Sequence, residues 1–373
     1  MKKSLFFKTL LLGAVIPALW AGGKGDSFWQ KAEKPLVGIS MPTQGETRWN
    51  FDGAYLKAQL QKAGFQVDLQ YAQNNSRLQS EQIRRLAERG SRFLVVAPVE
   101  AGALIGALED AAGKGARIIA YNQLITGTAA VECLVFFDPY HIGIAQGNIV
   151  SDTLGLYRGT TGPLNLEFVT GPQTDLEAVH IFAGSNAVLK RYVDAGIIAV
   201  PSLKYPFPPY KDALRWTREA ARTYMADILA TVYPGGTGPN NRGLDAILTG
   251  SDTIALGVID ALKAAGYGQG AGKIPLPVIA GQGCDLSNVR VILAGDQTGS
   301  VFMDPRLLAH RTVDIIQTMA GGGNLPAPST GGYHNGVKQV PAFLCTPRLV
   351  YRSTVREVLV DSGYYTTREL GLK

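Results

Sequence analysis

The chain has 373 residues, of which 46% are hydrophobic and 18% are charged. This length and composition are those of an ordinary globular protein with room for two domains, each with its own core. The formal net charge of +6 does not indicate a nucleic-acid-binding protein, because the basic residues form no stripe and are not interleaved with aromatic residues.

The N-terminal segment has the features of a secretory signal peptide. Lys2 and Lys3 provide a basic start, an apolar run covers residues 10–20, and small residues follow from Ala21. The run is too short to span a bilayer. We therefore expect residues 1–21 to be removed and the mature protein to be periplasmic, nearly neutral and without a transmembrane helix. An N-terminal membrane anchor is the alternative.

Strand-like and helix-like patterns alternate in the first half of the chain. Short apolar runs are followed by segments with helical spacing, and Gly64 and Gly90 stand where helices are expected to end. Ser80 is a plausible N-cap. The expected strands are 36–41, 65–71, 93–97 and 117–121, and the expected helices are 49–63, 80–89 and 101–113.

The same alternation then starts again. The expected strands are 134–138, 164–170, 197–200, 245–249, 275–280 and 299–303, and the expected helices are 141–154, 176–195, 214–232, 251–265 and 306–319. Strands that are apolar throughout are typical of parallel sheets covered by helices on both faces. Two successive sets of such units predict an α/β protein with two similar lobes.

Two loops carry the most informative polar residues. Residues 41–49 follow the first expected strand, and residues 119–124 lie at the end of the fourth. In open α/β sheets, ligands bind beyond the carboxyl ends of the strands. On a chain with a secretory signal, these two loops indicate a soluble receptor for a small polar molecule.

Several segments resemble the periplasmic sugar-binding proteins of ABC importers, most of all the xylose-binding and multiple-sugar-binding branch of type I. They are Gly38–Thr43, Arg48-Trp49, Asp68–Ala72, Ile119–Ile125, Phe137-Asp138, Val188–Gly196, Val278–Gln282 and Val340–Leu344. The resemblance implies two Rossmann-like lobes, each a parallel sheet flanked by helices, joined by three hinge crossovers near Asp138, Phe302 and Pro341. It assigns 34–138 plus 304–340 to the N-terminal lobe and 139–303 plus 341–373 to the C-terminal lobe.

The resemblance is weaker at the expected pocket. Where this branch typically has Tyr-Asp-Arg-Leu, the chain has Asn122 and Gln123, and Met303 stands where a lysine is common. Both changes remove charge from the pocket. We therefore expect a less polar ligand, such as a deoxy- or O-alkylated sugar, or weaker binding of ordinary sugars.

Four candidate ligand-binding residues come from the two loops. The Arg48 guanidinium can donate hydrogen bonds in a fork to ring and hydroxyl oxygens, or it is a surface arginine at the start of a helix, where a cation opposes the dipole. Trp49 could stack on the apolar face of a sugar ring or pack in the core. Asn122 and Gln123 offer donors and acceptors that suit hydroxyl groups, or they form a polar turn.

The resemblance adds further candidates that follow later strands or lie at a hinge: Asp138, Asp175, Glu177, Trp216, Asp252 and Gln282. Gln282 ends a buried strand and has few structural reasons to be there, whereas each of the others has a structural alternative. Asp175 and Asp252 could cap helices, with the helix after Asp252 beginning near Thr253. Asp138 could tie a crossover, and Trp216 could pack in a helix. Glu177 could be an acid in the first turn of a helix, where the helix dipole stabilises it.

Signals of catalysis are weak. The four histidines form no metal-binding array, and neither a Gly-x-Ser-x-Gly elbow nor a Walker loop is present. We predict no metal, no cofactor and no enzyme activity. Sequence cannot say whether Cys133, Cys284 and Cys345 form a disulfide.

The expected function is the solute-binding component of an ABC importer, which binds a monosaccharide or similar polyhydroxylated molecule and delivers it to an ABC permease. The protein is expected to be a monomer. The alternative is a sensor accessory that presents its ligand to a chemoreceptor or histidine kinase, and a secreted enzyme on this scaffold is a third class.

Overall fold

The computed structural model describes residues 34–171, 175–203 and 217–372. The predicted signal peptide and Trp216 lie outside these ranges. No helix in the described ranges is long and apolar enough to cross a membrane.

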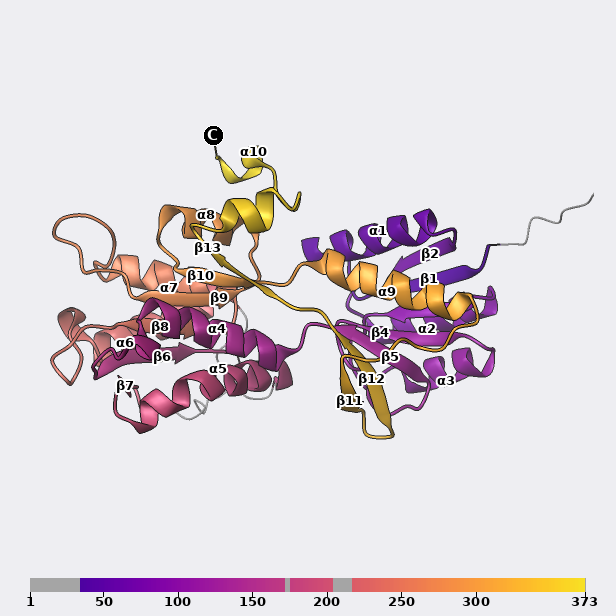
Figure 1. The fold of residues 1–373 in the computed structure, drawn as a ribbon, viewed down its shortest axis with the longest axis horizontal. Coiled ribbons are helices and arrows are strands. Elements are labelled where there is room, and N and C mark those ends of the chain that lie inside the picture. Colours follow the sequence, from indigo (N-terminus) through magenta and orange to yellow (C-terminus); the bar gives the residue numbers. More distant parts are fainter. Residues whose placement is uncertain (1–33, 172–174, 204–216, 373) are drawn as a thin grey trace, which may run out of the picture. The chain divides into compact units, whose positions relative to one another are not determined.

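The first sheet has seven strands in the order β11-β12-β5-β4-β3-β1-β2 (Figure 1). The strands are β1 (Leu36–Met41), β2 (Gln66–Tyr71), β3 (Phe93–Val96), β4 (Arg117–Tyr121), β5 (Val131–Phe136), β11 (Thr330–His334) and β12 (Gln339–Leu344). The pairs from β12 to β2 are parallel, whereas β11 pairs with β12 in the antiparallel direction.

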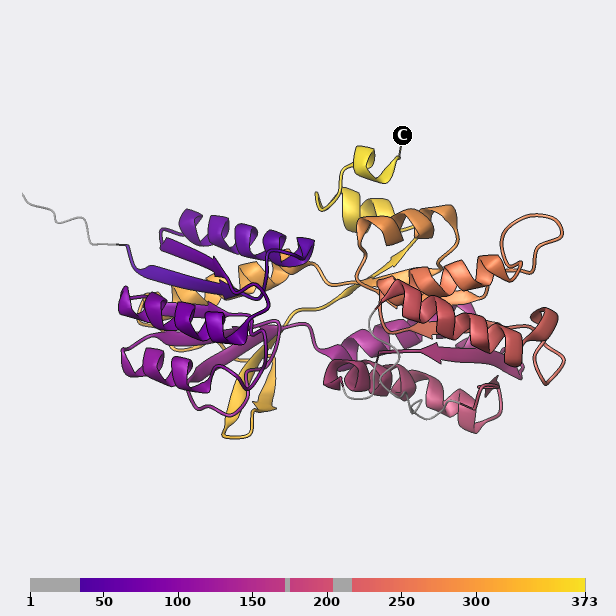
Figure 2. The same ribbon diagram turned by 180° about the vertical axis from the view of Figure 1, so that it is seen from behind.

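Helices cover both faces of this sheet, as the two opposite views show (Figures 1 and 2). They are α1 (Thr47–Lys62), α2 (Ser76–Glu88), α3 (Ile105–Gly113) and α9 (Pro305–Ala320). Val95 of β3 packs in the same cluster as Leu56 of α1 and Ile315 of α9, whereas Leu94 packs with Ile83 of α2. Successive strand residues point to opposite faces, so both layers of helices bury the sheet.

The second sheet has six strands in the order β13-β10-β9-β8-β6-β7. They are β6 (Leu164–Val169), β7 (Ile198–Ala199), β8 (Ala246–Thr249), β9 (Val278–Gln282), β10 (Gly299–Phe302) and β13 (Arg348–Tyr351). β13 is antiparallel to β10, and the other pairs are parallel.

Among its described residues, the second lobe has five main helices and several short ones. The main helices are α4 (Pro139–Thr153), α5 (Leu176–Asp194), α6 (Arg218–Thr231), α7 (Asp252–Ala264) and α8 (Leu286–Ala294). The short ones are 3-10 turns at Leu156–Arg158 and Pro234–Gly236, a π-helical turn at Arg356–Val360 and α10 (Thr367–Leu370).

The chain passes between the two sheets three times. It leaves the first sheet after β5, returns after β10 and leaves again after β12. The third crossing was expected near Pro341, which is too early, because Ala342, Phe343 and Leu344 still pair with β5. The second lobe therefore resumes only after Leu344.

The predicted α/β class with two lobes is confirmed, but some details were wrong. Each sheet has one antiparallel edge pair, so neither is wholly parallel. Helix α2 begins before Ser80, because Asn75 is the N-cap and accepts a hydrogen bond from the Leu78 backbone at 3.1 Å. Helix α3 begins at Ile105 rather than at 101, and α8 was not predicted.

Candidate functional site

The two loops that the sequence singled out meet at Arg48. Helix α1 begins at Thr47, so Arg48 and Trp49 lie in its first turn, soon after β1 ends. The Arg48 guanidinium donates a hydrogen bond to Oδ1 of Asn122, which directly follows β4. It also lies over the Trp49 ring, with Cζ 5.0 Å from the ring centroid. This cation–π contact holds the arginine beside the amide.

Trp49 itself is half-buried and packs against the core cluster of α1 and α9. The structure thus shows the packing role that the sequence offered for Trp49, and stacking on a sugar ring stays a prediction. Arg48 remains substantially exposed, with 40% of its side chain accessible. Its guanidinium is thus anchored on one side and open on the other.

The turn after β4 depends on the residue type at position 122. Asn122 has φ +65°, in the left-handed region that asparagine tolerates better than most residues. Its backbone N–H donates to the Val135 carbonyl at 2.8 Å. The turn directs the Asn122 side chain toward Arg48, while Gln123 is exposed.

A buried glutamine on α2 fixes the carboxyl ends of β1 and β3. Gln79 donates to Ser40 Oγ at 3.1 Å and to the Ala97 carbonyl at 2.8 Å, and it accepts from the Val99 N–H at 2.8 Å. All of these partners lie in or just beyond the strand ends. Gln79 therefore stabilises the rim of the sheet from which the Arg48 loop begins.

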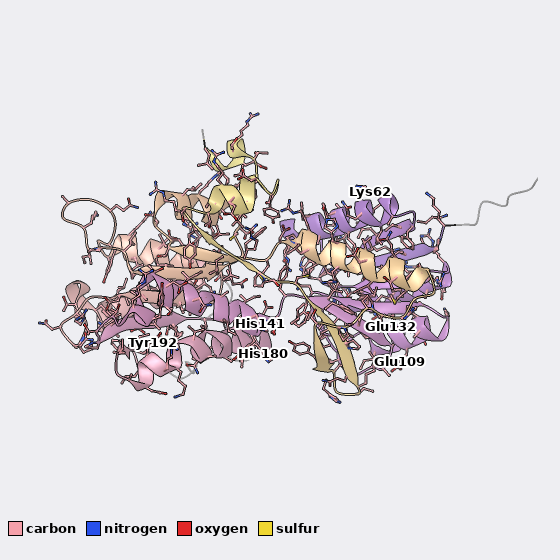
Figure 3. The ribbon with its side chains drawn as sticks, in the orientation of Figure 1. Lys62, Glu109, Glu132, His141, His180 and Tyr192 are labelled. Carbon is pink, nitrogen blue, oxygen red and sulfur yellow. The ribbon has the colours of Figure 1, made fainter. Side chains whose placement is uncertain are left out.

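Asp138 lies at the first crossing between the sheets, and its carboxylate has three hydrogen-bond partners. It is the N-cap of α4 and accepts from the Tyr140 N–H at 3.0 Å, from His141 Nδ1 at 2.8 Å and from the Tyr333 hydroxyl at 2.9 Å. His141, labelled in Figure 3, lies near the start of α4. Tyr333 belongs to β11 of the first sheet. These contacts support the role of Asp138 in tying the crossover.

The start of α5 contributes two acidic candidates. Asp175 is the N-cap of α5 and accepts a hydrogen bond from the Glu177 N–H at 2.8 Å. Glu177 is solvent-exposed, yet the surrounding protein partly desolvates its carboxylate, which raises its pKa. The positive charge of Arg48 lowers this pKa, and the negative charge of Asp175 raises it. Glu177 of the second lobe thus lies within electrostatic range of Arg48 of the first.

Asp252 lies deeper than the sequence suggested. The helix cap is Ser251, whose side chain accepts from the Ile254 N–H, and Asp252 is the first helical residue rather than the cap. The Asp252 carboxylate is buried and accepts hydrogen bonds from the Cys284 N–H at 2.6 Å, Gln297 Nε2 at 2.8 Å and Ser300 Oγ at 2.8 Å.

A glycine makes this network possible. A Cβ on Gly281 of β9 would lie 2.2 Å from the Asp252 carboxylate, so only glycine leaves room for it. The network joins α7, β10 and the turn after β9.

Gln282 is the last residue of β9, and of the two polar groups of its amide only the NH₂ is hydrogen-bonded to a described residue. Its Nε2 donates to the Gly250 carbonyl at 3.1 Å, whereas its buried Oε1 has no hydrogen-bond partner among the described residues. Gln146 of α4 has the same arrangement, with Nε2 bonded to the Thr249 carbonyl at 2.8 Å. Two amide oxygens near the ends of β8 and β9 are therefore available as acceptors.

Sequence reasoning missed two polar residues beside Arg48. Asp52, one turn further along α1, is fully buried, and its Oδ2 lies 3.9 Å from Arg48 Nε. Tyr121, the last residue of β4, is also fully buried. The only sequence signal was an acid four residues after an arginine in a helix, a spacing that also describes an exposed ion pair.

Cys133, Cys284 and Cys345 are buried, free thiols. Within the described ranges, no three histidine, cysteine or acidic side chains gather as a metal site would require. Two surface hollows, one between α6 and α7 and one beside α9, are lined by none of the candidate residues.

Comparison with known proteins gives a consistent family. Residues 37–324 match the model of the periplasmic binding protein domain. The chain is 37% identical to the multiple sugar-binding periplasmic protein SbpA of Azospirillum brasilense, over 96% of this chain and 98% of that protein. It is 35% identical to the multiple sugar-binding periplasmic receptor ChvE of Rhizobium radiobacter, over 91% and 93%.

A solved structure agrees with these sequence relatives. An ABC transporter solute-binding protein from Clostridium phytofermentans with bound β-D-glucose shares 39% identity and a TM-score of 0.77, over 90% of this chain and 99% of that chain. The alternating strands and helices, the two sheets and the matched residues lead to one conclusion: the chain belongs to the periplasmic binding protein family.

Proposed function

We propose that this protein is the periplasmic solute-binding component of an ABC importer and that it binds one monosaccharide, or a similar polyhydroxylated molecule, between its lobes. The observation that carries the proposal is the Arg48–Asn122 pair at the carboxyl ends of β1 and β4, with the free Gln282 and Gln146 oxygens at the ends of β9 and β8. Relatives named as sugar-binding proteins and a glucose-bound structure support this class of ligand.

The donor set suits a neutral, hydroxyl-rich ligand. Arg48 supplies charged donors, Asn122 and Gln123 supply amide donors and acceptors, and Gln282 supplies a buried acceptor. A sugar hydroxyl donates and accepts at once, so it can satisfy both kinds of group. Trp49 adds an apolar ring surface. A micromolar dissociation constant corresponds to about −8 kcal/mol, which several such hydrogen bonds in a water-poor cleft can supply.

The proposal includes closure of the lobes about the three crossings. Short connections have few residues to absorb a rotation, so the motion should be a hinge. Small-angle X-ray scattering should show a smaller radius of gyration with saturating ligand. An unchanged radius would contradict closure while leaving binding itself open to direct measurement.

Export to the periplasm and delivery to an inner-membrane permease complete the proposal. The basic start and apolar run at residues 1–21 support cleavage and export. N-terminal sequencing of the secreted protein tests this, because the mature chain should begin shortly after Ala21.

Ligand screening tests the function directly. Thermal shift against pentoses, hexoses, inositols and nucleosides should reveal a stabilising sugar, and calorimetry should then give its affinity. Arg48→Ala should lose about 2–3 kcal/mol of binding free energy, because a charged donor is removed from the site. Arg84→Ala, which removes an exposed arginine paired with Asp110 on α3, is the matched control. Stabilisation by amino acids alone would refute the sugar class.

The amide pair at 122 and 123 tests ligand selectivity. Changing Asn122→Asp and Gln123→Arg together introduces two charged partners, and charge-assisted hydrogen bonds are about twice as strong as neutral ones. The double variant should bind common aldoses more tightly than deoxy sugars. Equal preference in both proteins would show that these positions do not contact the ligand.

A further inference from the structure

Asp52 is an unusual residue for the interior of a helix-covered sheet. Its side chain is fully buried, and within the described part of the chain neither carboxylate oxygen accepts a hydrogen bond of good geometry, although the Tyr121 hydroxyl lies close enough to lower its pKa. Buried polar groups are nearly always hydrogen-bonded, so an exception needs an explanation. A leucine or alanine would fill this position without the cost of burying an acid.

Arg48 connects this carboxylate to the candidate site. It lies one turn before Asp52 on α1, and its Nε is 3.9 Å from Asp52 Oδ2. The other end of the guanidinium donates to Asn122, and its plane lies over the Trp49 ring. The arginine therefore has an anion behind it, an amide beside it and an aromatic ring beneath it.

We infer that Asp52 is a positioning residue for ligand binding, whose buried negative charge holds the Arg48 guanidinium in the direction that meets the ligand and offsets the cost of enclosing it. This inference rests on the proposed function, because it takes Arg48 as a group that binds the ligand. Asp52 itself is too deeply buried to contact the ligand.

A consequence is that affinity for a neutral sugar should depend on pH. The titratable and charged groups that act with Asp52 come from its own helix and four neighbouring segments: Arg48, Tyr71, Tyr121, Asp304 and Tyr364. Arg48 is the cation of this set. Desolvation raises the pKa of Asp52 to about 6, although the charge of Arg48 and the Tyr121 hydroxyl oppose that shift.

Closure of the cleft over Arg48 removes water and strengthens its attraction to ionised Asp52. Binding should therefore lower the pKa of Asp52, and affinity should fall as the pH drops below about 6. If binding lowers this pKa by one unit, linkage predicts about five-fold weaker binding at pH 5 than at pH 8.

Titration calorimetry of the mature protein with D-glucose at these two pH values tests the inference. The wild type should show the five-fold change, whereas Asp52→Asn should bind more weakly at pH 8 and show no pH dependence in this range. Asp68→Asn, which makes the same change on β2 in an acid paired with Arg89, should behave as the wild type does. Wild-type affinity and an unchanged pH profile in Asp52→Asn would overturn the inference.

A second measurement needs no ligand and separates the two proposals. The carboxyl carbon of Asp52 can be followed by NMR as the pH changes. In Arg48→Ala the pKa of Asp52 should be higher than in the wild type, because the opposing positive charge is gone. An unchanged pKa would overturn the coupling, whatever the ligand. Failure of every sugar to bind the wild type would instead refute the proposed function.

Discussion

Asp52 in the first lobe and Asp252 in the second are both buried aspartates on helices that follow parallel strands. Desolvation raises the pKa of each to about 6. Their surroundings differ, because Asp252 accepts well-formed hydrogen bonds from Cys284, Gln297 and Ser300, whereas among the described residues Asp52 has only the poorly aligned Tyr121 hydroxyl beside it. Two equally buried carboxylates therefore differ in how well they are hydrogen-bonded.

Two glutamines show the same contrast, but here the fully hydrogen-bonded residue belongs to the first lobe and the partly bonded one to the second. Gln79 of the first lobe uses both its donor and its acceptor on strand ends, whereas Gln282 of the second leaves Oε1 unused. A satisfied polar group fixes the scaffold, and an unsatisfied one retains its capacity for another partner. From this contrast we propose a scaffold role for Asp252 and Gln79 and a ligand-binding role for Asp52 and Gln282.

The largest expected effect is the loss of stability in Asp252→Asn. Whichever way the new amide is oriented, its NH₂ group faces a buried donor, either the Cys284 N–H or Gln297 Nε2. Loss of charge-assisted bonds and an unsatisfied donor should lower the free energy of unfolding by about 3–4 kcal/mol. Urea unfolding at neutral pH measures the change.

Ser300→Ala provides the matching control for that experiment. It removes one donor to Asp252 and leaves the other two in place. It should cost about 1–2 kcal/mol, clearly less than Asp252→Asn. If Asp252→Asn were as stable as the wild type, the network would not hold the second lobe together.

The same substitution at Asp52 should have the opposite sign. Burial of the ionised carboxylate costs stability at both positions, but at Asp252 the three donors that would lose their charged acceptor outweigh that cost. A native pKa of about 6, against 3.8 in the unfolded chain, means that the folded state binds more protons between these values. Stability due to Asp52 therefore falls as the pH rises from about 4 to 6 and stays low above 6. Asp52→Asn removes this cost and should stabilise the protein by about 2–3 kcal/mol at pH 7.5.

The pH series makes this prediction specific. Near pH 4 the wild-type Asp52 is protonated in the folded state, so the advantage of Asp52→Asn should shrink toward zero. A stabilisation that stays constant from pH 4 to 7.5 would contradict the proposed cause. Together with the expected loss of ligand affinity, a gain in stability would mark Asp52 as a residue kept for function.

The glutamine pair provides a smaller, parallel test. Gln79→Met keeps the side-chain volume but leaves the Val99 N–H and the Ala97 carbonyl without their buried partner. It should lower the free energy of unfolding by about 2 kcal/mol. Gln282→Met breaks one bond, to the Gly250 carbonyl, and should cost about 1 kcal/mol while weakening sugar binding. Equal losses would remove the distinction between the two glutamines.

The fold followed from local patterns more fully than the site did. Strands β1 and β4 were predicted to the residue, because each is an apolar run bounded by polar turns. Helix α8 and the antiparallel strand β13 were missed, since β13 is placed by pairing with β10, about fifty residues earlier.

For the candidate site, the rule that ligands bind beyond the carboxyl ends of strands pointed to Arg48 and Asn122, which the structure joins by a hydrogen bond; their contact with a ligand stays a prediction. Asp52 could not be selected in this way. The sequence pattern of an acid in a helix predicts an exposed side chain, whereas Asp52 interacts electrostatically with Tyr71 of β2 and Tyr121 of β4. Deep polar groups of this kind are determined by tertiary packing, which a single sequence does not display.

The smallest expected effect concerns the turn that presents Asn122. Its φ of +65° is costly for alanine, so Asn122→Ala should lower the free energy of unfolding by roughly 1 kcal/mol. Asn122→Gly should be close to neutral in stability, because glycine adopts this conformation without strain. Both variants remove the amide that accepts from Arg48, so both should weaken sugar binding alike. Thermal unfolding and calorimetry on the two variants separate the contribution of the backbone from that of the side chain. If only Asn122→Ala bound sugar poorly, the turn conformation, rather than the amide, would be what the first lobe contributes at this position.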